Sequence, residues 1–188
     1  MSTTLYIKNM VCDRCIMVVK QLLTACGLPV EQVVLGQATL AEKPDAQQLQ
    51  QIGKELSKVG FELLDDKNSQ MVERIKNEIV RLVYDDHAHL KTKLSNHLSS
   101  LLNCDYSALS KLFSEQTGTT IEKFYIMQKI ERVKELLSYG ELTLNEIAVK
   151  MDYSSIAYLS AQFKSITGLT PSQYKADKQS HRLSIDQI

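Results

Sequence analysis

Residues 95–118 read SNHLSSLLNCDYSALSKLFSEQTG, and residues 143–168 read TLNEIAVKMDYSSIAYLSAQFKSITG. Both stretches contain Asp-Tyr-Ser, then Leu-Ser, then a Phe three residues after that Ser, and finally Thr-Gly, with three additional residues between Asp-Tyr-Ser and Leu-Ser in the second copy. Duplication of this kind indicates a structural unit that the chain uses twice. A short helix, a tight turn and a second amphipathic helix make the helix-turn-helix pattern, so we predict two such motifs.

The second helix of each copy has an apolar stripe and a polar face, as a recognition helix requires. In the first copy we expect a buried set and an outward set: Leu109, Leu112 and Phe113 inside, and Ser107, Ser110, Lys111 and Ser114 outside. In the second copy the corresponding sets are Ile156, Leu159, Phe163 and Ile166 inside, and Tyr158, Ala161, Gln162, Lys164 and Ser165 outside.

Capping signals mark where the neighbouring helices begin. Thr119 with Glu122, Thr143 with Glu146, and Thr170 with Gln173 all have the spacing of a capping box, the last with Pro171 in the first helical position. Residues 119–140 read as one uninterrupted helix of about 20 residues, which is ~30 Å long. One turn of B-DNA is ~34 Å, so a rod of this length could place two recognition helices in successive major grooves.

The stretch FKSITGLTPSQYKA (163–176) makes the signal more specific. Phe163-Lys164, Gly168, Thr170-Pro171 and Tyr174 match the end of the signature of the AraC/XylS family. Residues 88–176 therefore resemble the DNA-binding domain of AraC/XylS-type transcription regulators. The resemblance implies an all-α domain over residues 88–178 that binds double-stranded promoter DNA through two helix-turn-helix units joined by a long helix.

The resemblance also implies which residues contact DNA. Family base-contacting positions fall on Ser107, Ser110 and Lys111 in the first unit and on Ile156, Ala157 and Ala161 in the second. Many members have Arg where this chain has Ala161, and alanine can touch a thymine methyl but cannot form a bidentate pair with guanine. We therefore expect more polar base readout from the first unit. The second is expected to act mostly through phosphates, by way of Ser154, Ser155, Ser160 and Lys164.

Charge argues neither strongly for DNA nor against it. The formal net charge is zero, and from His87 onward there are 12 Lys and Arg against 10 Asp and Glu. This weak basic bias predicts modest affinity with a shallow salt dependence. A helical interaction module that never meets DNA is the alternative interpretation of this half.

The first sixty-odd residues alternate between short strands and helices. LYIK (5–8), VEQVVLGQATLA (30–41) and FELL (61–64) have strand character, and helices are expected over 13–26 and from Pro44-Asp45 to Val59. The order is β-α-β-α-β, with Gly36 as either a bulge or a tight turn. Because the stretch between Pro29 and Pro44 is short for two strands, we expect an α+β module, ferredoxin-like or one strand short.

Cys12 and Cys15 lie in a loop, NMVCDRC (9–15), between the first strand and the first helix. A Cys pair at a helix N-terminus is expected to have lowered thiol pKa values, because the helix dipole and Arg14 favour the thiolates. Two soft thiolates suit Cu(I), whereas Zn(II) requires four ligands. Cys26 and Cys104 read as small buried hydrophobes.

Met10-x-Cys12-x₂-Cys15, with Lys58-Val59-Gly60-Phe61, resembles the heavy-metal-associated domain over residues 4–65. In that family the Met packs inward and is not a ligand. This chain departs from the family in having Asn9 where a Gly usually precedes the Met. Metal binding at Cys12 and Cys15, thiol redox sensing, and a purely structural role therefore remain open for the loop.

Composition sets the remaining limits. With 44% hydrophobic and 23% charged residues the chain is of the globular class, and no apolar run approaches the ~20 residues of a membrane span. The start of the chain lacks the layout of a signal peptide, so we expect a cytoplasmic protein. No nucleophile–base pair or glycine-rich phosphate loop is present, so an enzyme is not expected.

The sequence thus predicts two domains, 1–67 and 88–178, a connecting helix or linker over 68–87 and a tail over 179–188. The expected function is that of a sequence-specific AraC-type transcription regulator that responds to metal or thiol state and requires no cofactor, with Cu(I) at Cys12 and Cys15 as the candidate ligand. A homodimer is compatible with this function. The alternative is a copper carrier whose helical half is a protein-interaction module.

Overall fold

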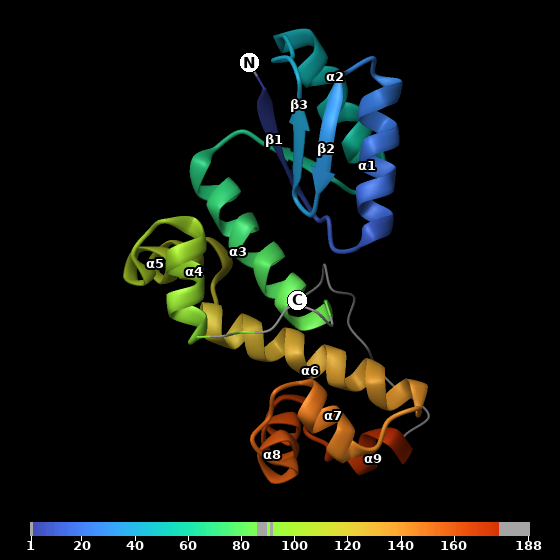
Figure 1. Ribbon diagram of the computed structural model, residues 1–188, viewed down its shortest axis with the longest axis vertical. Coiled ribbons are helices and arrows are strands. Elements are labelled where there is room, and N and C mark those ends of the chain that lie inside the picture. Colours follow the sequence, from blue (N-terminus) through green and yellow to red (C-terminus); the bar gives the residue numbers. More distant parts are fainter. Residues whose placement is uncertain (1, 86–89, 91, 177–188) are drawn as a thin grey trace. The chain divides into compact units, whose positions relative to one another are not determined.

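The computed structural model describes residues 2–85, 90 and 92–176, and its contacts divide them into two compact units (Figure 1). One unit contains Met1–Glu78 and Leu98–Leu112, and the other contains the remaining described residues. The expected tail (179–188) and the end of the expected linker (86–87) lie outside the described residues. In the part of the chain that is described, no helix is both long enough and apolar enough to cross a bilayer.

The first 64 residues form an α+β module with a β-α-β-β-α-β order. Its elements are β1 (Thr3–Lys8), α1 (Asp13–Ala25), β2 (Val30–Val34), β3 (Gln37–Leu40), α2 (Ala46–Lys58) and β4 (Glu62–Leu64). The strands form one antiparallel sheet in the order β2-β3-β1-β4. This order of strands and helices is the ferredoxin-like topology.

The expectation that the module might be one strand short is wrong. Both β2 and β3 fit between Pro29 and Pro44, because Leu35 and Gly36 join them in a two-residue turn. Gly36 has a φ of +74°, a conformation that glycine adopts without the steric penalty of a side chain. The irregularity in pairing lies at the start of β2, between Val30 and Gln32. Gly36 is therefore a turn residue and not the bulge.

Helices α1 and α2 pack side by side and contact β2 and β4, respectively (Figure 1). They cover the module's apolar core, whose fully buried members are Ile7, Met10, Val19, Ala38, Leu40 and Leu56. Asp45 begins α2 with a complete capping box to Gln48. The apolar periodicity of the sequence thus predicted both helices.

Helix α3 (Lys67–Tyr84) occupies most of the segment expected to connect the two domains. Its first half belongs to the compact unit that contains the sheet, where Ile75 is fully buried. Its last turn belongs to the other unit, where Val83 joins the apolar core and the ring of Tyr84 lies 5.3 Å from the Arg132 guanidinium carbon. One continuous helix therefore supplies residues to both units.

The remaining described residues are helical. They form α4 (Leu94–Leu102), α5 (Tyr106–Thr117), α6 (Ile121–Tyr139), α7 (Leu144–Lys150), α8 (Ile156–Thr167) and α9 (Pro171–Ala176). The capping boxes expected at Thr143 and Thr170 are present. The box expected at Thr119 is not: the N-cap of α6 is Thr120, whose hydroxyl accepts a hydrogen bond from the backbone N–H of Lys123. The backbone N–H of Thr119 donates to the hydroxyl of Thr117 and not to Glu122, so the reciprocal half of the expected box is replaced by another contact.

Candidate nucleic-acid interface

Two helix-turn-helix motifs, α4–α5 and α7–α8, are present where the duplication predicted them. In each motif one residue of the turn adopts a left-handed backbone conformation, Asn103 with a φ of +50° and Asp152 with a φ of +52°. Asn and Asp tolerate this conformation better than other residues with side chains. Two residues separate Asn103 from α5 and three separate Asp152 from α8, so the second turn is one residue longer after its left-handed residue.

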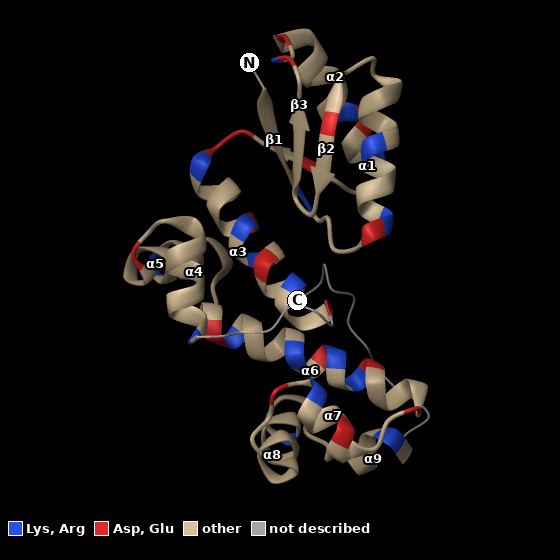
Figure 2. Cartoon of the chain, in the orientation of Figure 1, with Lys and Arg blue, Asp and Glu red and all other residues tan. Residues whose placement is uncertain are grey.

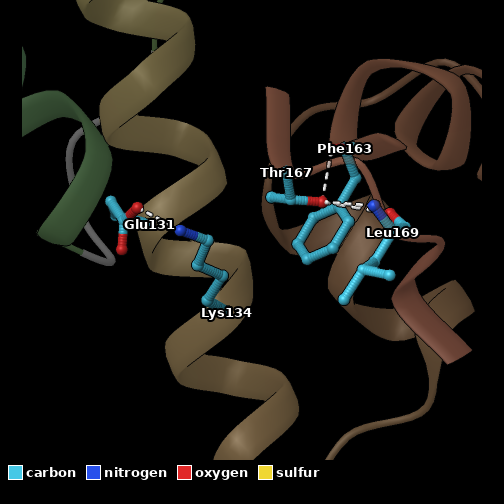
Figure 3. A network of polar contacts seen from close by, with 5 residues as sticks. All are labelled: Glu131, Lys134, Phe163, Thr167 and Leu169. Carbon is cyan, nitrogen blue, oxygen red and sulfur yellow. Dashed lines mark hydrogen bonds and ion pairs between the residues drawn. The ribbon is translucent and has the colours of Figure 1, made fainter. Parts of the chain in front are cut away.

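The strongest structural match between the copies lies at the C-terminal end of each second helix. The hydroxyl of Thr167 donates to the carbonyl of Phe163 over 2.8 Å and accepts from the backbone N–H of Leu169 over 3.2 Å (Figure 3). Thr117 makes the same two contacts with Phe113 and Thr119, at 2.7 and 3.3 Å. Each Thr is followed by a glycine in the left-handed conformation, a common way to end a helix.

The match continues into the helix that follows each motif. The ring of Phe113 meets that of Phe124 edge-on with centroids 5.6 Å apart, and Phe163 meets Tyr174 in the same way at 5.4 Å. The repeated unit therefore extends past Thr-Gly, a feature that the sequence comparison missed. Asp-Tyr-Ser, by contrast, is not equivalent in the two copies: Tyr106 and Ser107 lie in α5, whereas Tyr153 and Ser154 lie in the turn before α8.

This alignment fixes which residues of α5 and α8 occupy equivalent positions. Leu109 and Phe113 are buried, as are their counterparts Leu159 and Phe163. Helical spacing then puts the opposite face of α5 at Ser107 and Lys111, which are both exposed, with Ser110 half-buried at its edge. The three residues expected to contact bases through α5 thus lie on one side of that helix.

On α8 the face opposite Leu159 and Phe163 is formed by Ala157, Ala161 and Lys164, which are all exposed. Ser160 is half-buried, and Ser154 and Ser155 are exposed in the turn, where Ser155 caps α8 by accepting a hydrogen bond from the Tyr158 N–H. Lys164 is the single charged residue within α8, which Figure 2 shows as a nearly uncharged helix. The expected contact residues of the second motif therefore share one surface of that motif.

Two residues expected in the buried stripe of α8 are exposed instead. Ile156 and Ile166 are 39% and 41% exposed, because they lie in the first and last turns, beyond the central Leu159 and Phe163. The exposure of Ile156 agrees with its expected place among the contact residues. Tyr158, at 55% exposure, adds a large aromatic ring to the same end of the helix.

The turn of the second motif is held by aromatic rings and a buried lysine. The ammonium nitrogen of Lys129 lies 4.1 Å from the ring centroid of Tyr153 and 5.6 Å from that of Tyr125. Burial lowers the pKa of Lys129 to about 8, although the negative charge of Asp152 opposes this shift. The hydroxyl of Tyr153 donates to Oε1 of Gln162 over 2.6 Å. These contacts attach the turn to both α6 and α8.

Elsewhere on α6, the Lys134 ammonium lies 2.5 Å from the Glu131 carboxylate (Figure 3). Both side chains are less than a tenth exposed, at 9% and 7%. A buried charge is tolerated when it is paired in this way. The pair is therefore buried on α6 and does not lie on the exposed faces of α5 and α8.

The thiol loop lies at one end of the sheet. The Sγ atoms of Cys12 and Cys15 are 3.5 Å apart, Cys12 is exposed and Met10 is fully buried. Two thiolates that bind one metal ion in a linear arrangement, with metal–sulfur bonds of ~2.3 Å, are about 4.6 Å apart. The two Sγ atoms are closer than this, so linear coordination requires the side chain of the exposed Cys12 to rotate outward. Among residues 2–85, 90 and 92–176, no group of three or more His, Cys, Asp and Glu side chains is placed to hold a metal ion.

The expectation of a lowered thiol pKa is wrong for Cys15. Burial raises the pKa of the Cys15 thiol, and this effect exceeds that of the hydrogen bond with the Val11 backbone, which lowers it. Desolvation disfavours a thiolate more here than the start of α1 favours it. Cys26 and Cys104 are partly exposed and not fully buried as expected.

The helical half matches a known family. The family described as a helix-turn-helix domain matches residues 98–177. An uncharacterized HTH-type transcriptional regulator of Staphylococcus aureus (strain N315) is 34% identical over 116 residues, which are 62% of this chain and 14% of that protein. The xylose operon regulatory protein of Escherichia coli (strain K12) is 26% identical over 185 residues, which are 88% of this chain and 47% of that protein.

The chain thus spans less than half the length of these curated relatives. Among solved structures, the C-terminal domain of AraT, a response regulator from Geobacillus stearothermophilus, has a TM-score of 0.51 at 24% identity, covering 63% of this chain and 92% of that chain. That similarity shows a shared fold. The names of both curated relatives describe regulatory proteins, and neither describes an enzyme. Residues 98–177 thus match the helix-turn-helix domain family, and they share the fold of the C-terminal domain of AraT.

Proposed function

We propose that this protein is a cytoplasmic, sequence-specific transcription regulator that binds promoter DNA through α5 and α8. The observation that carries the proposal is that the chain builds the same helix-turn-helix motif twice and leaves the equivalent face of each second helix exposed. The connecting helix α6 has 19 residues and is therefore about 28 Å long, close to one turn of B-DNA. In this proposal the two recognition helices enter successive major grooves.

We further propose that the α+β module adjusts DNA binding in response to a metal ion or to the thiol state of Cys12 and Cys15. The support is the pair of adjacent thiols, one of them exposed, together with a helix that contributes residues to both compact units. A pair of soft thiolates suits Cu(I), which accepts two ligands, better than Zn(II), which requires four. In this proposal the ion is a signal, and DNA binding itself requires no cofactor.

A mobility-shift titration with the full chain tests both parts of this proposal. Promoter fragments are titrated in the presence of excess competitor DNA, with and without Cu(I), using wild type and the double variant Cys12→Ser, Cys15→Ser. A specific complex supports the regulator, and a change in its affinity with Cu(I) that the double variant abolishes supports the metal response.

Other results of the titration would contradict one part or both. A specific complex that is indifferent to both Cu(I) and thiol oxidation would eliminate the proposed response and leave the regulator intact. Stoichiometric uptake of Cu(I) without any retardation of DNA would instead indicate the copper carrier. Sedimentation of the specific complex would give the number of chains on the DNA and test for a homodimer.

A further inference from the structure

The two recognition helices present different chemistry at equivalent positions. Because Leu109 and Phe113 correspond to Leu159 and Phe163, Ser107 corresponds to Ala157 and Lys111 to Ala161. The repeated threonine hydrogen bonds support this alignment independently of the apolar positions. Where α5 has a hydroxyl and an ammonium group, α8 has two methyl groups.

The surroundings of those methyl groups are also apolar. Ile156 and Tyr158, 39% and 55% exposed, flank them in the first turn of α8. The nearest side-chain amide, that of Gln162, is half-buried and its oxygen already accepts a hydrogen bond from Tyr153. The expected base-contacting positions of α8, which are Ile156, Ala157 and Ala161, therefore carry no hydrogen-bond donor in their side chains, and the ammonium group of Lys164 lies one turn beyond Ala161.

We infer, on the basis of the proposed function, that α8 reads thymine methyl groups and that α5 reads polar base edges. In the major groove, thymine presents a methyl group at C5, and an alanine methyl can pack against it. Guanine presents two acceptors there, and a lysine such as Lys111 can donate to them. The target site is then chemically asymmetric, with a thymine-rich half under α8 and a half with hydrogen-bonding partners under α5.

Replacing single thymines by uracil tests this inference, because deoxyuridine differs from thymidine only by that methyl group. Sites are first selected from random duplexes with the full chain, and then each thymine of the selected site is replaced by dU in turn. Under α8 we expect affinity to fall about fourfold for each contacted thymine, the equivalent of one buried methyl group. Under α5 we expect no systematic loss.

Two matched variants identify which half of the site belongs to which helix. Ala161→Arg is expected to change the selected sequence from thymine to guanine in the α8 half only, since arginine can form a bidentate pair with guanine. Lys111→Ala, at the equivalent position of α5, is expected to relax preference in the other half and leave the dU effects unchanged. Circular dichroism of both variants checks that each retains the fold.

The outcomes separate this inference from the proposed function. If the full chain selects no sequence at all, the proposed function is wrong and this inference fails with it. If it selects a site but dU replacement has no effect in the half that Ala161→Arg alters, DNA binding stands and methyl recognition by α8 is overturned. If dU replacement lowered affinity only in the half that Lys111→Ala alters, methyl recognition by α8 would also be overturned.

Discussion

The backbone N–H of Asn9 donates a hydrogen bond to Oε1 of Glu73 over 3.2 Å. Asn9 lies in the left-handed region, with a φ of +72°, and its side chain also donates to the carbonyl of Gly60 over 2.9 Å. Glu73 is on α3, so this helix is hydrogen-bonded to the first residue of the thiol loop (9–15). Gln70, one turn earlier on α3, donates to the carbonyl of Leu64 over 3.1 Å. The thiol loop and the strand β4 are thus both hydrogen-bonded to α3.

The first prediction concerns the protonation of Glu73. Burial raises the pKa of its carboxyl group above the ordinary 4.5, and the charge of Lys76 and the bond from Asn9 only partly oppose this. The folded protein then holds this proton more tightly than the unfolded chain, so stability falls as the pH rises from 4.5 through the raised pKa. Glu73→Gln keeps an acceptor for Asn9 and removes the charge. We expect the variant to be at least as stable as wild type at pH 7, with a flatter dependence below it.

Urea denaturation between pH 4 and pH 8 measures this effect. Glu55→Gln is the control, since Glu55 pairs with the exposed Lys58 on α2, where a surface ion pair contributes ~0–1 kcal/mol. If Glu73→Gln lost more stability at pH 7 than Glu55→Gln, the buried charge would be favourable and the prediction wrong.

A second prediction concerns the hairpin turn at Gly36. A Cβ atom added there would lie 1.9 Å from Nδ2 of Asn77 on α3, in addition to the strain of a positive φ. At Gly27 the φ is also positive, +76°, but no atom lies within 4 Å of the added Cβ. Gly27→Ala should therefore show the backbone penalty alone, ~1–2 kcal/mol, and Gly36→Ala a larger loss in the free energy of unfolding.

The double variant Gly36→Ala, Asn77→Ala isolates the contact with α3. It should recover part of the loss, because the clash disappears while the positive φ remains. If Gly27→Ala and Gly36→Ala lowered the free energy of unfolding equally, the contact between Asn77 and the turn would not restrict residue 36.

The sequence predicted the helical half well because duplication supplied two independent copies of one pattern. Leu109, Phe113, Leu159 and Phe163 lie inside the motifs as expected, at the centres of long helices where periodicity is reliable. The errors fall at helix ends and turns. Ile156 and Ile166 lie in terminal turns, and the sequence offered two adjacent threonines, Thr119 and Thr120, of which the second is the cap.

In the α+β module the sequence did not decide whether one strand or two lie between Pro29 and Pro44. Two strands fit the short stretch only because Gly36 permits a two-residue turn, and the sequence allowed either a turn or a bulge there. The pKa of Cys15 was misjudged for a related reason. A helix N-terminus can be inferred from the sequence, whereas the burial that raises the pKa of the Cys15 thiol is a property of the folded loop.

The third prediction uses the repeated threonines. Thr167→Val keeps the shape of the side chain but leaves the N–H of Leu169 without its acceptor, so we expect a loss of ~1–3 kcal/mol in the free energy of unfolding. Thr117→Val should lose a similar amount, and Ser at either position should restore most of it. Ser165→Ala, at an exposed position, should change stability by less than ~0.5 kcal/mol. A loss at one threonine and none at the other would contradict the structural equivalence of the copies.

The fourth prediction concerns Lys129. Its pKa is lowered from 10.5 to about 8, so between these values the unfolded chain binds more protons than the folded protein. Stability should therefore rise as the pH increases from about 8 toward 10.5. Lys129→Met should flatten this rise while leaving the apolar contacts of the stem in place. Denaturation at pH 7.5, 8.5 and 9.5 checks this, and an equally steep rise in the variant would assign the effect to another group.

The fifth prediction concerns Lys111, the exposed cation on the outward face of α5. Lys111→Ala should weaken binding to a selected site by ~1–3 kcal/mol if the lysine contacts a base edge, with relaxed specificity at that position. If it contacts a phosphate instead, the loss should be uniform across sequences, and the slope of log affinity against log salt should become shallower by about one. Lys54→Ala, which removes an exposed lysine of α2, controls for net charge. Salt titrations with the selected site and a scrambled duplex separate the two results, and affinity equal to that of Lys54→Ala on both duplexes would exclude α5 from the interface.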